Sequence, residues 1–193
     1  MHLAQEATTG FFFLAPWLVF APLIGLLINL IFGGWFMKRP WGENAVGIIA
    51  SLASGAAFVV SVLLTLSLSA NHGEVMRWYL AEWIHIGELQ LDWTFRVDSL
   101  STTMMLVVSG VGTLIHIYAI GYMREDVRFK NDIGRFPRFF IYLNLFIAMM
   151  MILVAGDSYM MLFVGWEGVG LCSFLLIGFW YELDTLGKSS WAN

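Results

Sequence analysis

Long runs of apolar residues, separated by short polar segments, dominate this chain of 193 residues. A helix needs about 20 apolar residues to cross the hydrocarbon core of a bilayer. Five runs reach or approach that length, and we predict a transmembrane helix in each. They cover residues 11–37, 45–70, 100–123, 139–155 and 159–181. We therefore expect an all-α membrane fold of about five transmembrane helices, with residues 1–193 forming a single transmembrane domain.

Proline and a short connection define the ends of three of these spans. Pro16 and Pro22 lie within the first apolar run. We expect its helix to begin within a few residues of Pro16 and to kink near Pro22. Only Gly156, Asp157 and Ser158 separate the last two runs. Such a short connection predicts a tight antiparallel pair of helices.

The polar segment between the second and third spans has a different period. Apolar residues occupy every second position across residues 89–97, with polar residues such as Gln90 and Asp92 between them. A period of two is that of a β-strand, and Gly87 with Glu88 can form a turn before it. We therefore predict a small amphipathic β-hairpin that lies on the outward-facing membrane surface.

Lys and Arg residues are shared unequally between the two sets of loops. If successive loops alternate between the two sides, one side receives Lys38, Arg39, Arg124, Arg128, Lys130, Arg135, Arg138 and Lys188, and the other receives Arg77 and Arg96. Positive residues accumulate on the cytoplasmic side of membrane proteins. We therefore expect the N-terminus, the hairpin and the 156–158 turn to face outward. The basic loops and the C-terminus then face the cytoplasm or a mitochondrial matrix.

Composition supports a membrane protein and excludes several classes of function. Charged residues make up 12% of the chain, about half the usual share in a globular domain, and the net charge of −4 argues against nucleic-acid binding. The chain has a single cysteine and four scattered histidines, with no metal-ligand spacing and no glycine-rich phosphate loop. We expect no cofactor or metal in this chain. The first ten residues contain no Lys or Arg, so we expect no cleaved secretory signal.

Most acidic residues lie in the predicted loops or at the ends of the predicted spans, but Glu167 does not. It lies near the middle of the fifth span, between Gly165-Trp166 and Gly168-Val169-Gly170. A charged side chain at this depth costs about 3 kcal/mol on insertion scales. Charged residues inside a membrane therefore normally face a protein interior or a water-filled cavity. We therefore predict that Glu167 is a proton-relay group. The structural alternative is a protonated carboxyl that hydrogen-bonds a neighbouring helix.

Three other polar residues also fall inside the predicted spans. His116 lies about two-thirds of the way along the third span. A neutral imidazole both donates and accepts a hydrogen bond, so His116 is a second candidate for proton transfer, although taken alone it is slightly better explained by a structural hydrogen bond to a neighbouring helix. Asn29 and Asn144 are predicted to form hydrogen bonds between helices.

Residues 165–181 read GWEGVGLCSFLLIGFWY. This stretch closely resembles the signature of antiporter-like subunit L of bacterial NADH-quinone oxidoreductase, which is called subunit 5 in mitochondrial complex I. The similarity extends to residues 95–101 (FRVDSLS), 116–123 (HIYAIGYM) and 138–140 (RFF). These segments resemble the start of the family's third helix, the end of that helix and the start of the next, in the family's order.

The resemblance implies a proton-translocating subunit in the membrane arm of a respiratory complex. Glu167 matches the family's essential acid in the fifth helix, which pairs with a lysine two helices later. FMN, iron–sulfur clusters and quinone are expected in partner subunits, and this chain is not expected to contact NADH. The implied location is the bacterial inner membrane. Family members are much longer, so we expect only their N-terminal part here, without the partner lysine.

Three alternatives remain open at this point. The large subunit of multisubunit cation/proton antiporters shares the signature, and a subunit of a membrane-bound hydrogenase is a second alternative. Additional C-terminal domains would mark the antiporter. A purely structural membrane scaffold is the third alternative, and it predicts that Glu167→Gln leaves proton pumping unchanged.

Overall fold

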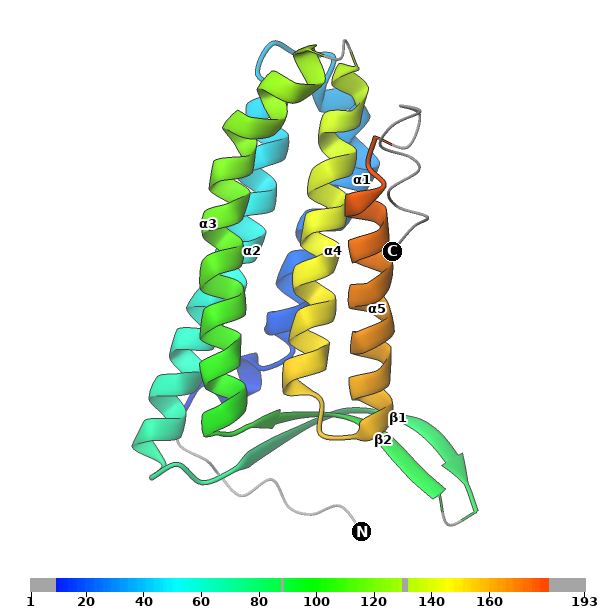
Figure 1. Ribbon diagram of the computed structural model, residues 1–193. Coiled ribbons are helices and arrows are strands. Elements are labelled where there is room, and N and C mark those ends of the chain that lie inside the picture. The colour runs from blue at the N-terminus through cyan, green and yellow to red at the C-terminus, as the bar shows by residue number, and fades with distance from the viewer. Residues whose placement is uncertain (1–9, 88, 130–131, 181–193) are drawn as a thin grey trace.

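The computed structural model describes residues 10–87, 89–129 and 132–180. Five helices in this part of the chain are long and apolar enough to cross a membrane. They stand side by side, and a two-stranded hairpin crosses one end of the bundle (Figure 1). The elements in chain order are η1 (Phe12–Leu14), α1 (Trp17–Phe36), α2 (Gly42–Ala70), β1 (Met76–Ile86), β2 (Leu89–Val97), α3 (Ser99–Phe129), η2 (Ile133–Arg135), α4 (Phe136–Ala155) and α5 (Tyr159–Ile177). The predicted fold class is confirmed.

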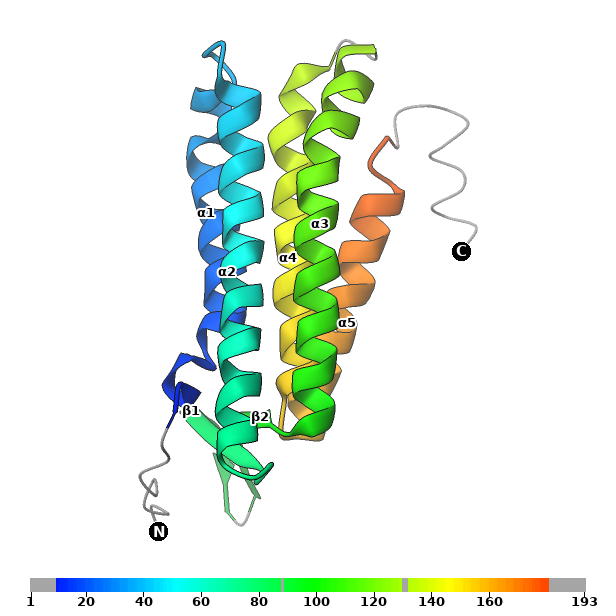
Figure 2. The same ribbon diagram turned by 90° about the vertical axis from the view of Figure 1, so that its left-hand side faces the viewer.

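Helix α4 is the centre of the arrangement. It packs against α1, α2, α3 and α5, while α2 also packs between α1 and α3. Figures 1 and 2 show α5 at the side of the molecule, next to α4 and away from α1 and α2. Four helices therefore enclose a common interior, and α5 rests on the outside of α4.

Two apolar clusters fill the interior, one toward each end of the bundle. The cluster near the hairpin includes Leu18, Leu64, Phe95, Met105, Met151 and Met161. The cluster at the opposite end includes Val46, Ala119, Met123, Phe136 and Phe140. Helices α2, α3 and α4 contribute to both clusters, and α1 contributes to the first and packs against the second through Phe36. These four helices therefore form one packed body.

Each predicted span corresponds to one of the five helices, and a clear difference in the bounds is found where α3 ends. Helix α3 runs on to Phe129, so Arg124 and Arg128 are helical, although they were predicted to lie in a loop. Glu43 of α2 pairs with both guanidinium groups in these extra turns, at 3.0 Å from Arg124 and 2.8 Å from Arg128. The end of the apolar run predicts where α3 leaves the membrane. The helix itself continues beyond that point, and its polar turns form these ion pairs.

The remaining predictions about the helix ends are largely confirmed. Helix α1 follows Pro16, as predicted, and Pro22 lies inside it. Helix α4 begins three residues earlier than expected, because Pro137 is well suited to the first turn of a helix. Only three residues separate α4 from α5, and these two helices pack against each other as predicted.

The hairpin prediction is also confirmed. Strands β1 and β2 pair antiparallel, from Met76 opposite Val97 to Ile86 opposite Leu89. Gly87 turns the chain with φ +59°, a conformation that glycine adopts without strain. Glu88, the other predicted turn residue, lies outside the described residues. Phe95 and Val97 of β2 are buried against the end of the bundle. The apolar face of the strand, which the alternating sequence predicted, therefore packs against the helices.

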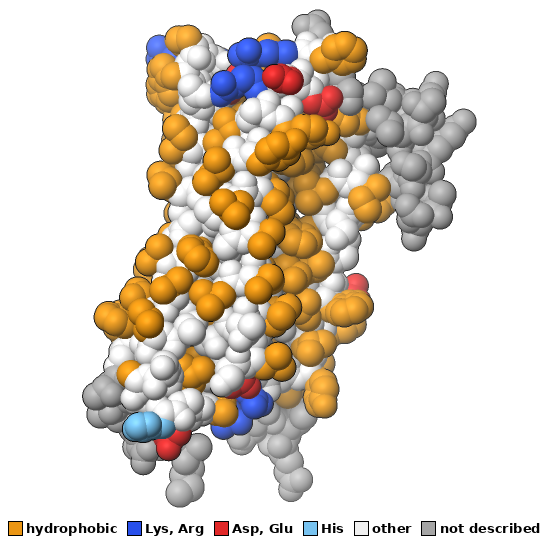
Figure 3. All heavy atoms as spheres, turned by 60° about the vertical axis from the view of Figure 1, so that its left-hand side comes forward, with side chains coloured by type: hydrophobic (Ala, Val, Ile, Leu, Met, Phe, Trp, Pro, Cys, Tyr) orange, Lys and Arg blue, Asp and Glu red, His pale blue; other side chains and the backbone are white. Residues whose placement is uncertain are grey.

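Charged side chains gather at the two ends of the molecule, and hydrophobic side chains dominate the surface between them (Figure 3). The α1–α2 and α3–α4 connections lie at one end, and the hairpin and the α4–α5 turn lie at the other (Figure 1). The described basic residues therefore divide as predicted, with Arg77 and Arg96 at the hairpin end. Lys130 and Lys188 lie outside the described residues.

Candidate functional site

Helix α5 lies so close to α4 that two of its glycines have no room for a side chain. A Cβ atom at Gly165 would lie 2.6 Å from the backbone nitrogen of Leu153. A Cβ atom at Gly168 would lie 2.5 Å from Sδ of Met149. These glycines allow the two helices to approach at backbone contact. They fix which side of α5 faces α4, and therefore which side faces away.

Glu167 lies on the side of α5 that faces away from α4. It is eight residues from the start of the helix, about 12 Å along its axis, and therefore near mid-depth. Its side chain is exposed, and it forms no ion pair with any described residue. The prediction that Glu167 faces a protein interior is therefore not met within the described part of this chain.

His116 has the opposite setting, because it is completely buried between α3 and α4. Its Nδ1 lies 2.8 Å from the carbonyl oxygen of Gly112, and its Nε2 lies 2.9 Å from Oδ1 of Asn144. Asn29 of α1 donates to the carbonyl of Val46 in α2 at 3.2 Å. Both asparagines therefore form hydrogen bonds between helices, as predicted.

The structure does not bring Glu167 and His116 together. Asn144, the partner of His116, is nine residues before Leu153, which packs against Gly165 of α5. Nine residues correspond to about half a turn around the axis of α4. The two candidate proton-transfer residues therefore lie on opposite sides of α4.

Hydroxyl groups link α2 to α3 on the hairpin side of His116. Oγ of Ser54 lies 3.2 Å from Oγ1 of Thr113, and Ser109 donates to Oγ of Ser61 at the same distance. Ser54, Ser61 and Ser109 are completely buried. Small polar residues at an interface allow close packing and supply hydrogen bonds that lipid cannot.

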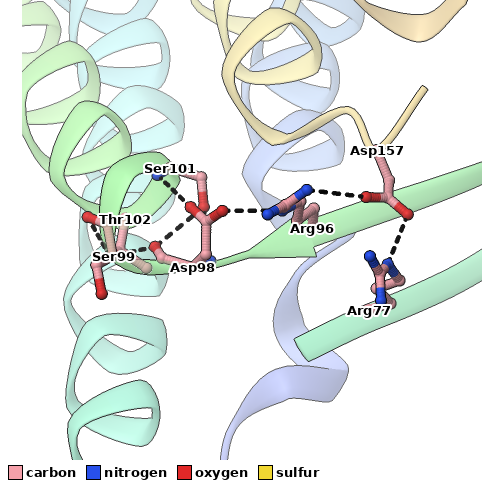
Figure 4. Close-up of polar contacts among 7 residues, drawn as sticks. All are labelled: Arg77, Arg96, Asp98, Ser99, Ser101, Thr102 and Asp157. Atoms are coloured by element: carbon pink, nitrogen blue, oxygen red, sulfur yellow. Dashed lines mark hydrogen bonds and ion pairs between the residues drawn. The ribbon is translucent and has the colours of Figure 1, made fainter. Parts of the chain in front are cut away.

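A chain of charged residues crosses the hairpin end of the bundle (Figure 4). Asp157, in the α4–α5 turn, accepts a hydrogen bond from Nε of Arg77 at 2.8 Å and lies 3.8 Å from the guanidinium of Arg96. Arg96 also donates to Asp98 at 2.8 Å. Burial would raise the pKa of Asp98, but hydrogen bonds from Ser101 and the charge of Arg96 outweigh this effect and hold that pKa below its usual range.

The same region holds the start of α5 in place. The backbone N–H of Asp157 donates to the carbonyl of Thr94 at 3.0 Å, and Phe95 pairs with Gly156 as an isolated β-bridge. Ser158 then caps α5 by accepting from the N–H of Met161 at 3.2 Å. The hairpin therefore positions the N-terminal end of the helix that bears Glu167.

The opposite end of α5 is attached through residues that follow the helix. Arg135 donates to the carbonyl of Phe179 at 3.2 Å, and the indole N–H of Trp180 donates to Asp126 at 2.8 Å. Sequence reasoning missed these contacts and the Arg77–Asp157 pair. The charges themselves were visible at the ends of the predicted spans, but their partners are 44 to 80 residues apart in sequence.

Among the described residues, no three His, Cys, Asp or Glu side chains gather in a way that could hold a metal ion. Cys172 is buried and unpaired. Within the described part of the chain, the two residues predicted to transfer protons thus lie on the exposed side of α5 (Glu167) and inside the bundle (His116).

The bundle and its carboxyl at membrane depth define a multi-pass helical membrane protein. Comparison with known families gives the particular group. Residues 83–140 match the family model described as NADH-ubiquinone oxidoreductase (complex I), chain 5 N-terminus. The chain is a homologue of NADH-quinone oxidoreductase subunit L, also called chain 5.

Individual relatives agree with this assignment. The chain is 46% identical over 169 residues to NADH-quinone oxidoreductase subunit L of Mycobacterium tuberculosis, which covers 86% of this chain and 25% of that protein. It is 39% identical over 163 residues to subunit L of Escherichia coli, covering 84% and 25%. It is 36% identical over 173 residues to NADH-ubiquinone oxidoreductase chain 5 of Aspergillus niger, covering 90% and 24%. The chain spans about a quarter of the length of these curated relatives.

Proposed function

We propose that this chain is the N-terminal part of the proton-translocating, antiporter-like subunit in the membrane arm of NADH-quinone oxidoreductase, and that Glu167 is its proton relay. The observation that carries the proposal is the position of Glu167, near mid-depth on the side of α5 that faces away from α4. The names of the relatives favour this function over a separate cation/proton antiporter or a hydrogenase subunit.

The exposed side of α5 needs another protein segment to cover it. A carboxylate that faces lipid at the bilayer centre costs about 3 kcal/mol on insertion scales, and more in other estimates. The relatives are about four times as long as the segment that this chain matches. We propose that helices from that additional length pack against α5 and place a lysine near Glu167.

A neighbouring cation would let Glu167 exchange protons in step with turnover. A cation close to the carboxyl favours the carboxylate, and withdrawal of the cation favours uptake of a proton. Movement of the cation away from Glu167 would therefore load one proton, and its return would release that proton. This chain would contribute the carboxyl and the close packing of α5 against α4 that holds it in position.

The proposed setting is the membrane arm of the complex, in the bacterial inner membrane, with the N-terminus outside and the residues after α5 on the cytoplasmic side. Its partners are the other membrane-arm subunits and the surrounding lipid. FMN, iron–sulfur clusters and quinone would be held by partner subunits, and this chain would not contact NADH. The concentration of basic residues at the end away from the hairpin supports this orientation.

The test is Glu167→Gln in the full-length subunit within its complex. Glutamine keeps the size of the side chain but cannot exchange a proton. We expect assembled complex and NADH oxidation, but fewer protons moved per NADH in membrane vesicles. Glu125→Gln is the matched control, because Glu125 is exposed in the last turns of α3, outside the apolar part of the span. Equal proton pumping in both variants would refute the relay and favour a scaffold.

A further inference from the structure

The interior of the four-helix bundle contains a second group that can hold a proton. His116 and Asn144 are both completely buried, and Asn144 also lies against α1, because a Cβ atom at Gly25 would be 2.9 Å from its Nδ2. The pair therefore faces α1 and α3, on the side of α4 away from Glu167. The hydrogen-bond donors and acceptors around the ring indicate which of its nitrogens carry a proton.

Both ring nitrogens of His116 face an oxygen that can only accept. The carbonyl of Gly112, 2.8 Å from Nδ1, requires a proton on Nδ1. Oδ1 of Asn144, 2.9 Å from Nε2, requires a proton on Nε2 as well. This arrangement therefore satisfies an imidazolium, whose two N–H groups both donate.

Turning the Asn144 amide by half a turn converts the pair to its neutral form. Nδ2 then replaces Oδ1 and donates to Nε2, which keeps its lone pair, while Nδ1 still donates to Gly112. The far end of the amide does not resist the turn, because Nδ2 has no hydrogen-bond partner and faces a glycine, Gly25. Oxygen and nitrogen are nearly the same size, so both orientations fit the same space.

We propose that His116 and Asn144 form a second proton-binding site, in which the orientation of the Asn144 amide changes with the protonation of Nε2. In the charged state Nε2–H donates to Oδ1, and in the neutral state the amide donates to Nε2. One proton leaves Nε2 or returns to it, and no covalent bond to carbon changes. This site does not depend on the function proposed for Glu167.

In the part of the chain that the structure describes, no charged side chain adjoins the pair. On α3 the next charged residue is Arg124, eight residues away, and on α4 it is Arg138, six residues before Asn144. These separations correspond to about 12 Å and about 9 Å of helix. Helix α1 has no charged residue, and α2 has only Glu43, in its first turn. Burial without a counter-ion disfavours the charged ring, and the hydrogen bonds to the two oxygen acceptors oppose that effect.

The surroundings favour access to the site from the hairpin end. Toward that end, the interior contains the buried hydroxyls of Ser54, Ser61 and Ser109 together with that of Thr113. Toward the opposite end, it contains an apolar cluster that includes Ala119, Met123, Phe136 and Phe140. The polar groups nearest to His116 therefore lie on its hairpin side, and the apolar cluster that includes Leu64 and Met105 lies beyond them toward the hairpin.

The test is nitrogen NMR of the full-length protein in lipid, with 15N-labelled histidine and asparagine. The difference between wild type and His116→Gln isolates the ring signals of His116. Between about pH 9 and about pH 5 we expect a neutral ring, protonated at Nδ1 only, to become a ring protonated at both nitrogens. The side-chain amide signal of Asn144 should shift over the same pH range.

Asn144→Leu is the second variant, because leucine is similar in volume but can neither donate nor accept. We expect the doubly protonated signal to disappear at every pH in this range. Thr113→Val is the control, since it removes a nearby hydroxyl and leaves the pair intact, and its titration should match wild type. A single tautomer of His116 throughout the range would overturn the proposal, as would an amide signal that stays fixed while the ring titrates. Proton pumping is not part of the readout, so failure here is distinguishable from failure of the Glu167 relay.

Discussion

The attachment of α5 to α4 can be tested by adding one methyl group. In Gly165→Ala the new Cβ would lie 2.6 Å from the nitrogen of Leu153 and 2.7 Å from its Cα. Both atoms belong to the backbone, so no side-chain rotation relieves the clash. Restoring a contact of about 3.4 Å requires α5 to move by roughly 0.8 Å, a gap that removes a quarter to a half of the dispersion attraction across the interface.

The expected cost follows from two opposing effects. Overpacking of this kind costs about 1–3 kcal/mol, and replacing glycine by alanine within a helix returns up to about 1 kcal/mol. Because the clashing atoms belong to the backbone, we take the upper part of that cost, about 2–3 kcal/mol, so that after the gain α5 separates from α4 more easily by about 1–2 kcal/mol. That change multiplies the population of separated molecules by about 5 to 30.

The single cysteine of the chain supplies the assay. Cys172 is buried on the same side of α5 as Gly165, seven residues further along, which is about two turns. The rate at which a thiol reagent labels Cys172 in detergent therefore reports separation of α5. We expect Gly165→Ala to be labelled about 5 to 30 times faster than wild type.

Gly55→Ala is the matched control within the bundle. Its Cβ would lie 3.7 Å from Cγ2 of Thr113, an ordinary contact, so labelling of Cys172 should match wild type or be slower. Gly168→Ala should fall between the two variants, because its Cβ meets the flexible side chain of Met149. If Gly165→Ala and Gly55→Ala give the same labelling rate, the close approach of the two helices is wrong.

Two further predictions concern the ends of the bundle. Asp98→Ala should lower the free energy of unfolding by about 0.5–2 kcal/mol, because Asp98 accepts from the N–H of Ser101 in the first turn of α3. Since folding lowers the pKa of Asp98, this stabilisation is present above the unfolded pKa of about 3.9 and is lost as the pH falls through the folded pKa. In denaturant unfolding, the difference between wild type and variant should therefore become smaller as the pH falls from about 7 to about 3. In a background without Cys172, an impermeant thiol reagent applied to the cytoplasmic face should label Ile133→Cys but not Gly73→Cys, and the reverse labelling would invert the topology.

The helices could be predicted because burial in lipid requires long apolar runs, and the hairpin because Phe95 and Val97 alternate with polar neighbours. The polar extension of α3 could not be predicted from apolarity. Its ion pairs depend on Glu43, which is 81 residues before Arg124 and reaches it only after α2 and α3 have packed. Contacts of this kind follow from tertiary structure and leave no local pattern in the sequence.

The candidate site shows the same division. A carboxyl in the middle of an apolar run identified Glu167, but its direction depends on which side of α5 packs against α4. Gly165 and Gly168 determine which side of α5 packs against α4. The sequence places several glycines around Glu167 and does not show which of them contact α4. For His116 the residue type predicted proton chemistry, whereas its partner Asn144 comes from a different helix and required the structure.

The central claim is that Glu167 gains and loses a proton while the enzyme works. Infrared difference spectroscopy of the full-length complex during NADH oxidation measures this directly, because a protonated carboxyl has a C=O band that a carboxylate lacks. We predict a carboxyl band that changes during turnover in wild type and is absent from the Glu167→Gln difference spectrum. A spectrum in which the same band persists in Glu167→Gln, or in which no carboxyl band changes, would contradict the claim.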